Sequence, residues 1–355
     1  MRAYHFVSIL AAASAAALMA GCAGTTGFAP SAGGGQAPPS SSAGSSSTMS
    51  APVRHNTAQV TPGVGPFLLS QTFAGTSTPA NQWLWTSTAC LTAGTASTPA
   101  TSIPACGGSA KQNPPGYGVL QLTPPSQFQV SMAAYDLPFS TVNGLRIKYN
   151  LYSYDGTGSD GTLLWMSYGN QPEPTMPAGT GGHLGYIDGT VDNAPPLANG
   201  RARPPSSTGG MANVYLGIGF DEFGNFSAFL PGGPGLVPQT VAVAGAQSIG
   251  YYYLTGVDNL SGQPVSLPFS LEQPGSRVRP KVVPAVEIML QPDGLLQVAI
   301  DIHDGQGYVT YISKNIVGIA GEPAVPSSVY IGINGSNGAN YERHEIDDLS
   351  ITTLQ

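Results

Sequence analysis

Residues 221–225, with the sequence Asp-Glu-Phe-Gly-Asn, directly follow the apolar run 213–220 and offer the clearest binding chemistry in the chain. Within five positions they supply carboxylates, an aromatic ring and an amide. Carboxylate, amide and carbonyl oxygens bind hard cations such as calcium, a ring can stack on a sugar face, and an amide can bond a hydroxyl. The segment has no nucleophile with a neighbouring base, so it predicts recognition and not catalysis.

Alternating apolar residues predict the strands that hold this segment in place. Apolar side chains occupy every second position in residues 145–151, 296–302 and 329–333, which is the spacing of half-buried strands. Clusters of Gly, Asp, Asn and Pro, such as residues 292–294, separate these runs and are typical of turns. No long segment combines a helical period with capping residues. The sequence therefore predicts one all-β domain within residues 61–355.

The N-terminus predicts export and a lipid anchor. Met1-Arg2 is followed by an Ala-rich apolar run, and Ala20-Gly21 then precede Cys22. This pattern is a secretory signal peptide, and Cys22 after Ala-Gly resembles the bacterial lipobox whose cysteine is acylated. We therefore interpret residues 1–22 as a lipoprotein signal with lipidation at Cys22. Residues 23–60, rich in Gly, Ser and Pro, are predicted to be a disordered tether.

Two further cysteines, Cys90 and Cys106, are predicted to form a disulfide, because an exported chain meets an oxidising compartment. Charged residues are 9% of the chain and the net charge is −7, with no basic cluster, so nucleic acid is excluded as a partner class. The residue after Cys22 is not Asp, which predicts the outer membrane or cell surface of a Gram-negative bacterium. The membrane partner is expected only through the lipid anchor.

Several motifs in order from about residue 118 to 353 resemble the L-type (legume-type) lectins, in particular bacterial secreted versions. They are Ser159-Asp160-Gly161 before an apolar strand, the loop Gly181-Gly182-His183-Leu184-Gly185, and Asp221 to Asn225, which matches an Asp-x-aromatic-x-Asn loop. The resemblance implies a concanavalin A-like jelly-roll β-sandwich with antiparallel sheets. It also implies a shallow sugar site where these three loops meet.

The resemblance assigns a role to each of five residues at that site. Asp160 would accept hydrogen bonds from two sugar hydroxyls, and the backbone N–H of Gly182 or Gly181 would donate one. Asn225 would add an amide contact, and Phe223 would stack on the pyranose face. All of these groups are expected to face outward together. Each motif also has a plainer explanation, as a turn, a glycine loop or a side chain that bonds its own backbone.

The sequence departs from the family where the plant relatives bind metal. Those relatives place Glu two residues before the strand's Asp, and Gly219 stands at that position here. The further Asp and His of the family are also missing. No transition metal is therefore expected. Calcium held by Asp221, the carbonyl of Phe223 and Asn225 stays open as a prediction.

The sequence thus predicts a surface-anchored lipoprotein that binds neutral glycans without catalysis. One alternative is a surface or adhesion protein that kept the fold and binds no sugar. Another is a glycoside hydrolase of the jelly-roll class, because Glu345-Ile346-Asp347 resembles the start of the Glu-x-Asp-x-x-Glu strand of those enzymes. Ser350 stands where the second Glu should be, so no enzymatic activity is expected.

Overall fold

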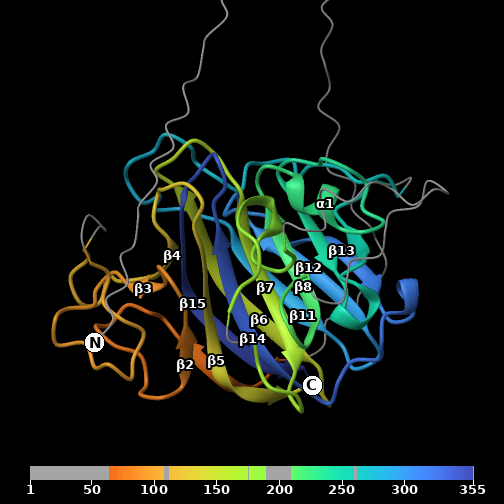
Figure 1. Cartoon of the computed structure of the whole chain (residues 1–355), viewed down its shortest axis with the longest axis horizontal. Coiled ribbons are helices and arrows are strands. Elements are labelled where there is room, and N and C mark those ends of the chain that lie inside the picture. Colours follow the sequence, from red (N-terminus) through yellow and green to blue (C-terminus); the bar gives the residue numbers. More distant parts are fainter. Residues whose placement is uncertain (1–63, 108–111, 175, 189–208, 260–261, 355) are drawn as a thin grey trace, which may run out of the picture. The chain divides into compact units, whose positions relative to one another are not determined.

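The computed structural model describes residues 64–107, 112–174, 176–188, 209–259 and 262–354, all of them within the unit Ser50–Gln355 (Figure 1). The predicted signal peptide 1–22, with Cys22, and the predicted tether 23–60 lie outside the described residues. Within the described ranges, no helix combines the length and the apolar character needed to cross a membrane.

Two antiparallel sheets form the fold. Sheet A has the order β13 (Val309–Asn315), β12 (Leu295–Asp301), β11 (Ala285–Leu290), β6 (Leu145–Tyr154), β15 (Arg343–Leu354), β4 (Leu120–Thr123) and β3 (Cys90–Leu91), with β1 (Val64–Gln71) paired to β15 outside this path. Sheet B has the order β10 (Tyr253–Gly256), β9 (Thr240–Ala244), β8 (Val214–Asp221), β7 (Gly161–Tyr168), β14 (Ser328–Ser336), β5 (Val130–Ser140) and β2 (Trp83–Trp85). The helical segments of the described chain are short: α1 (Asn225–Phe229) and the 3₁₀ turns η1 (Gly181–His183), η2 (Gln247–Ile249) and η3 (Ile319–Gly321).

Register explains how the alternating residues build the core. On sheet A, Ile351, Ile147, Ile288, Val298 and Ile312 lie opposite one another on successive strands and form one apolar row. Sheet B presents a matching row, Ala133, Ile333, Leu164, Ile218 and Val243. All ten side chains are buried in a single hydrophobic cluster. The two sheets therefore pack face to face, as expected when each strand offers one apolar face.

The outer face of sheet B is covered as well. Trp165, Leu163 and Val214 point away from the inter-sheet core and pack with Leu184, Tyr186, Phe226 and Leu230 in a second cluster. The covering residues come from the glycine loop around η1 and from α1. Two glycines on β8 make room for this cover: a Cβ on Gly217 would lie 2.8 Å from the ring of Tyr186, and one on Gly219 would lie 2.6 Å from the ring of Phe226.

The fold class predicted from sequence is confirmed. Every pairing between named strands is antiparallel, and the chain passes repeatedly between the sheets, as in a jelly roll. The apolar run 213–220 forms β8, and the segment 221–225 is the turn from β8 into α1. The N-terminal strands β1, β2 and β3 also belong to the sheets, since they pair with β15, β5 and β4.

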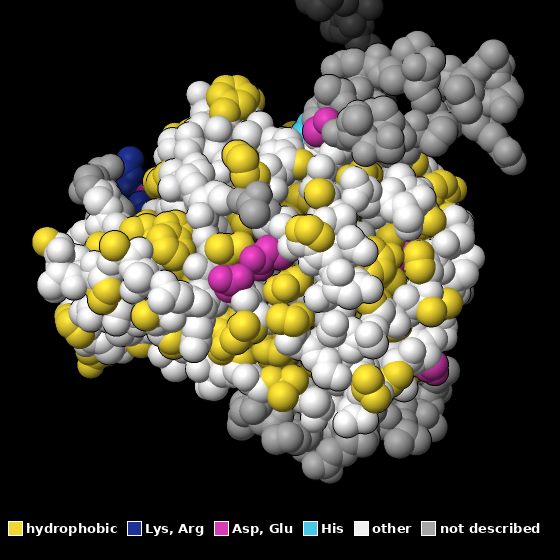
Figure 2. Space-filling view, turned by 60° about the horizontal axis from the view of Figure 1, so that its bottom comes forward, with side chains coloured by type: hydrophobic (Ala, Val, Ile, Leu, Met, Phe, Trp, Pro, Cys, Tyr) yellow, Lys and Arg dark blue, Asp and Glu magenta, His cyan; other side chains and the backbone are white. Residues whose placement is uncertain are grey.

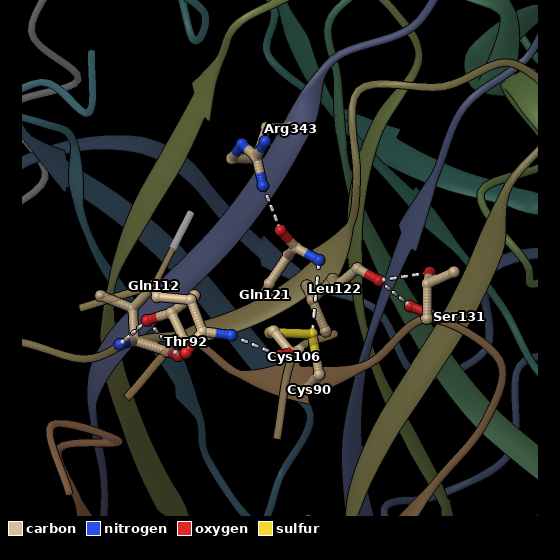
Figure 3. The surroundings of a disulfide bond; sticks show 10 residues. Cys90, Thr92, Cys106, Gln112, Gln121, Leu122, Ser131 and Arg343 are labelled. Carbon is tan, nitrogen blue, oxygen red and sulfur yellow. Dashed lines mark hydrogen bonds between the residues drawn. A yellow bond between two sulfur atoms is a disulfide. The ribbon is translucent and has the colours of Figure 1, made fainter. Parts of the chain in front are cut away.

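The Cys90–Cys106 disulfide is present, as predicted, with an S–S distance of 2.02 Å. Figure 3 shows how it is tied to sheet A. The side-chain amide of Gln121 on β4 donates to Cys90 Sγ at 3.3 Å, and Arg343 on β15 donates to the carbonyl oxygen of the Gln121 side chain. The disulfide loop is thus joined by side chains to the interior of the sheet.

Few charges reach the surface shown in Figure 2. Hydrophobic and uncharged side chains dominate this face, and one group of acidic side chains lies near its centre. This agrees with the low content of charged residues in the sequence, 9%. Such a face offers mainly neutral contacts to a ligand.

Candidate functional site

The structure brings together the three segments that the sequence singled out. The backbone N–H of Glu222 donates to the carbonyl of Asp160 at 2.9 Å, which joins the end of β8 to the loop before β7. A Cβ on Gly182 would lie 2.2 Å from Cβ of Asn225, so the glycine loop touches the start of α1. A Cβ on Gly181 would lie 3.6 Å from Oδ2 of Asp160. Asp160, Gly181, Gly182 and Asn225 are therefore neighbours.

Both loop glycines are required by their surroundings. Gly181 has φ +68, in the left-handed region, and Gly182 has no room for a side chain beside Asn225. The N–H of Gly181 donates to the carbonyl of Asn337 at 3.2 Å, and its own carbonyl accepts a bond from Ser336 Oγ at 2.9 Å. The Gly181 amide is thus engaged within the protein, which makes Gly182 the better candidate donor to a ligand.

Asp160 does not face outward as the sequence analysis expected. Its side chain is 3% exposed, and Oδ2 is buried without a hydrogen-bond partner among the described residues. The cause is the turn after β14, because a Cβ on Gly338 would lie only 2.7 Å from this oxygen. Burial raises the pKa of Asp160, while the Ser159 hydroxyl and the Gly338 N–H oppose that change. The peptide bond between Ser159 and Asp160 is cis.

The aromatic residues of the site are divided between surface and interior. Phe223 is 41% exposed, so its ring is free of the core and available for stacking. His183, in the glycine loop, instead stacks on Phe229 of α1, with ring centroids 4.9 Å apart and planes at 23°. Its Nδ1 lies 2.7 Å from the carbonyl oxygen of Thr180. His183 thus helps to hold the loop against α1.

Asp221 is fully buried and serves the turn that follows it. Its Oδ1 accepts the N–H of Gly224 at 2.7 Å, and Oδ2 accepts the N–H of Ser227 at 3.3 Å. Burial raises the pKa of Asp221 to about 8, against the effect of these bonds and of the Phe226 N–H. The carboxylate therefore acts as a cap for the first turn of α1.

This arrangement does not fit the predicted calcium ligands. Backbone N–H groups surround the Asp221 carboxylate, and such donors repel a cation where oxygen ligands are needed. Asn225 packs against Gly182. Gly219 stands where the resemblance implies a Glu, and the ring of Phe226 fills the space that a side chain at residue 219 would need. No chemistry is assigned to a metal at Asp221, Phe223 and Asn225.

A group of buried carboxylates on the inner side of the same loops was missed by the sequence analysis. Glu222, Glu272 and Glu342 each place a carboxylate oxygen within 4.8 Å of the others. His344, also buried, lies beside them, with Nε2 at 3.2 Å from Oε2 of Glu222. The pKa of Glu272 is raised to about 7 and that of Glu342 to about 9, chiefly by burial and next by the negative charge of Glu222.

One signal in the sequence pointed toward this group. Glu342, His344 and Ile346 alternate at the start of β15, and Ile346 lies in the inter-sheet core. Residues spaced by two share a face of a strand, so Glu342 and His344 were bound to point inward. No pattern indicated Glu272, which comes from the long connection between β10 and β11.

An open pocket of about 470 Å³ lies nearby and is lined in part by Tyr341, the residue before Glu342. Its lining is Pro125, Asp155, Gly156, Gly275, Arg277 and Tyr341. None of the five sugar-site residues predicted from sequence is part of this lining. Asp155 raises the pKa of Glu342, which places the pocket within electrostatic reach of the buried carboxylates.

The carboxylates that suggested a hydrolase are occupied by structural contacts. Glu345 is fully buried, pairs with Arg279 at 2.6 Å and accepts a bond from the Tyr154 hydroxyl at 3.0 Å. Asp347 accepts bonds from Tyr152 and Asn150, each at 2.8 Å. β15 also lies inside sheet A, between β6 and β4. This geometry offers no free acid/base pair at these positions.

Comparison with known proteins gives structural likeness alone. No protein-family model matches the chain, and no curated protein matches it. Among solved structures, the chain is similar to the winged bean acidic lectin complexed with methyl-alpha-D-galactose (18% identity, 81% of this chain and 99% of that one, TM-score 0.49). It is similar also to the Ca²⁺-bound exoplasmic/lumenal domain of VIP36 (14%, 80% and 89%, 0.47) and to lectin UEA-II complexed with galactose (14%, 82% and 100%, 0.47). At identities this low, the likeness concerns the fold alone. Because the TM-scores are below 0.5, the fold assignment depends on the strand order described above and not on these comparisons.

Proposed function

We propose that this protein is a non-catalytic carbohydrate-binding domain whose site is formed by Asp160, Gly181, Gly182, Phe223 and Asn225. The supporting observation is the meeting of three loops that are far apart in sequence: Gly182 lies against Asn225, and Gly181 lies beside Asp160. An acid, backbone amides, a side-chain amide and an exposed ring then lie at one end of sheet B. These are the groups that recognise a hydroxylated ring.

Each group has a defined part in such recognition. A sugar hydroxyl both donates and accepts, so the Asp160 carboxylate accepts from it while the Gly182 N–H donates to it. Asn225 contributes a second polar contact, and the ring of Phe223 covers an apolar face of the sugar. Hydrogen bonds to an ionised group are the stronger ones, which makes Asp160 the main determinant.

The charges around the site favour neutral glycans. Asp160 lies within electrostatic reach of Asp221 and Glu222, since the charge of Glu222 raises the pKa of Asp160 and the charge of Asp160 raises the pKa of Asp221. An anionic sugar such as a uronic or sialic acid would be repelled by this group of carboxylates. Neutral hexoses are not subject to that repulsion.

A glycan array probed with the full chain tests the proposal. We expect binding to at least one neutral glycan, and Asp160→Asn to weaken it about 10- to 100-fold, because a hydrogen bond to a charged group contributes about 1.5–3 kcal/mol. Asp304→Asn is the matched control, since Asp304 is an exposed acid in the loop after β12. Its affinity should equal that of the unmodified protein.

Two results would refute sugar binding at this site. One is a folded protein that binds no glycan on the array. The other is unchanged affinity in Asp160→Asn when circular dichroism shows the variant to be folded.

One observation favours a second candidate, a surface or adhesion protein of the same fold that binds no sugar. Asp160 is almost fully buried, with Gly338 over one of its oxygens. If this turn does not move, a hydroxyl cannot reach that oxygen. The absence of binding to any glycan on the array, together with pull-down of another surface protein by the full chain, would support this candidate.

We also infer that the chain is a lipoprotein anchored through Cys22, with residues 23–60 as a tether at the outer membrane or cell surface. The supporting pattern is the apolar N-terminus followed by Ala-Gly-Cys. Metabolic labelling with a palmitate analogue should mark the protein, and Cys22→Ser should abolish the label. Retention of the label in that variant would exclude this anchor.

A further inference from the structure

The carboxylates of Glu222, Glu272 and Glu342 converge from three separate parts of the fold. Glu222 follows β8 in sheet B, Glu342 immediately precedes β15 in sheet A, and Glu272 lies in the connection between β10 and β11. One oxygen from each lies within 4.8 Å of the other two. An ion at about 2.4 Å from each oxygen, the middle of the calcium range, bridges at most about 4.8 Å between two oxygens and about 4.2 Å between three equally spaced ones.

Most of the oxygens in this group lack a protein partner. Glu342 is 0% exposed, and neither of its carboxylate oxygens has a hydrogen bond of standard geometry among the described residues, while the Gly158 N–H is near enough to oppose the rise of its pKa. Two further oxygens lack a hydrogen-bond partner among the described residues: Oε1 of Glu222, whose side chain is also buried, and Oε2 of Glu272. Buried polar atoms are almost always satisfied, so a group of four unsatisfied acceptors indicates a missing partner.

The surrounding protein supplies little positive charge. Within the described part of the chain, no Lys or Arg forms an ion pair with Glu222, Glu272 or Glu342. The basic group in contact is His344, which faces Glu222 with Nε2 and Thr123 Oγ1 with Nδ1, at 3.2 and 2.7 Å. Three carboxylates this close cannot all ionise without a counter-charge.

We propose that Glu222, Glu272 and Glu342 together bind one divalent cation, with calcium preferred. Carboxylate oxygens are hard ligands, which select calcium, magnesium or manganese over softer metals. Magnesium requires oxygens at 2.0–2.1 Å in a rigid octahedron, whereas calcium accepts longer and less regular bonds. Two of the six carboxylate oxygens face protein groups, Glu222 Oε2 toward His344 and Glu272 Oε1 toward Gln239 Nε2 at 2.8 Å. The other four can bind the ion, and water would complete the about 6–8 oxygens that calcium takes. Glu272 is partly exposed and provides the route by which the ion enters.

A cation at this position would stabilise the loop 158–160, which lies beside the carboxylates. Glu222 bonds the backbone of Asp160, and a Cβ on Gly158 would lie 3.0 Å from Oε2 of Glu272. The cation therefore lies behind the loop 158–160 and joins it to both sheets. This inference concerns cation binding alone and does not depend on whether the protein binds sugars.

Calorimetric titration of the chelator-treated full chain with calcium at pH 8 tests the proposal. We expect one bound ion and a midpoint of thermal unfolding that rises with calcium concentration, because the ligand binds the native state. Glu342→Gln and Glu272→Gln should each weaken binding at least about tenfold, since affinity depends on the number of charged ligands. Asp221→Asn is the control. It removes the ligand predicted from sequence and should leave the affinity unchanged.

Anomalous diffraction from crystals of the unmodified protein locates the ion directly and completes the test. A crystal grown with manganese in place of calcium should give an anomalous peak between the three carboxylates. The proposal is overturned by a peak elsewhere, by the absence of binding up to about 10 mM calcium, or by a loss of binding in Asp221→Asn that Glu342→Gln does not share. Glu272→Gln gives the same comparison if Glu342→Gln does not fold.

Discussion

Two regions of the described chain bury carboxylates and neutralise them differently. On the outer face of sheet A, Glu345 pairs with Arg279 at 2.6 Å, and Glu287 pairs with Lys148 at 2.8 Å and with Arg146 at 3.6 Å. At the end of the inter-sheet core, Glu342 is as deeply buried as Glu345 but has no Arg or Lys against it among the described residues.

The difference shows that burial alone does not determine the state of an acid. Where a guanidinium faces the carboxylate, the protein itself provides the counter-charge, and the pKa of Arg279 is raised in return by Glu345. Where carboxylates face one another, the counter-charge must come from a proton or from an ion in solution. The first arrangement is structural, and the second can respond to the surroundings.

The largest expected effect comes from removing the cation of a paired carboxylate. Arg279→Met leaves the fully buried Glu345 without its partner. A buried charge left unpaired typically lowers the free energy of unfolding by about 3–5 kcal/mol. Urea denaturation of the variant and the unmodified protein measures this change.

Arg277→Met provides the control, because Arg277 is exposed and lies only two residues away. Its free energy of unfolding should change by no more than about 1 kcal/mol, the range for a contact made by an exposed charged side chain. Equal stability of Arg279→Met and Arg277→Met would show that the pairing with Glu345 contributes nothing, and the contrast between the two regions would then be lost.

A buried acid outside both regions tests whether a carboxylate without a basic partner makes stability depend on pH. Glu322 is 2% exposed, accepts the N–H of Ala246 at 2.9 Å, and has its pKa raised by burial to about 8. Its pKa is higher in the folded state than in the unfolded one, so the folded protein binds more protons between these two values. Stability from this group is complete below about pH 4.5 and is lost as pH rises through 8.

Glu322→Gln should therefore make the protein less sensitive to pH. The difference in free energy of unfolding between variant and unmodified protein should change in favour of the variant by at most about 1.4 kcal/mol per pH unit between pH 4.5 and 8. Denaturation curves at pH 5, 6.5 and 8 measure it. Parallel pH profiles for the two proteins would contradict the assignment.

The smallest effect is expected from a paired acid whose cation is partly in water. The Lys148 side chain is 36% exposed, and Arg146 also faces Glu287. Solvent screening limits such a pair to about 0–1 kcal/mol, so Lys148→Met should change the free energy of unfolding by no more than that. A loss as large as that of Arg279→Met would mean that exposure does not distinguish the two pairs.

The sequence predicted the strands well because their signal is local. Leu145, Ile147, Tyr149 and Leu151 alternate with polar residues, and β6 buries all four in the core. The nearness of Asp160, Gly182 and Asn225 was implied by the resemblance to the lectins, and the structure shows Gly182 against Asn225 and Gly181 beside Asp160. Their function stays a proposal.

The failures of sequence reasoning concern contacts between distant segments. Asp160 is buried by Gly338, and the carboxylate group needs Glu222, Glu272 and Glu342 to meet from three connections. The spacing of residues along the sequence does not indicate which distant segments will be in contact. The capping role of Asp221 could have been predicted from the glycine three residues later. Gly224, at φ +97, turns the chain so that its N–H points back to the Asp221 carboxylate.

The ring of Phe226 beside Gly219 has a consequence for how such a protein can change. A carboxylate introduced at residue 219 alone would collide with the ring, 2.6 Å from where its Cβ would stand. Truncation of Phe226 alone would open a void that costs about 3–5 kcal/mol. Each single substitution is harmful, and a gain needs both at once. Descendants of this chain therefore face a barrier against acquiring a transition metal at β8, whatever selection favours.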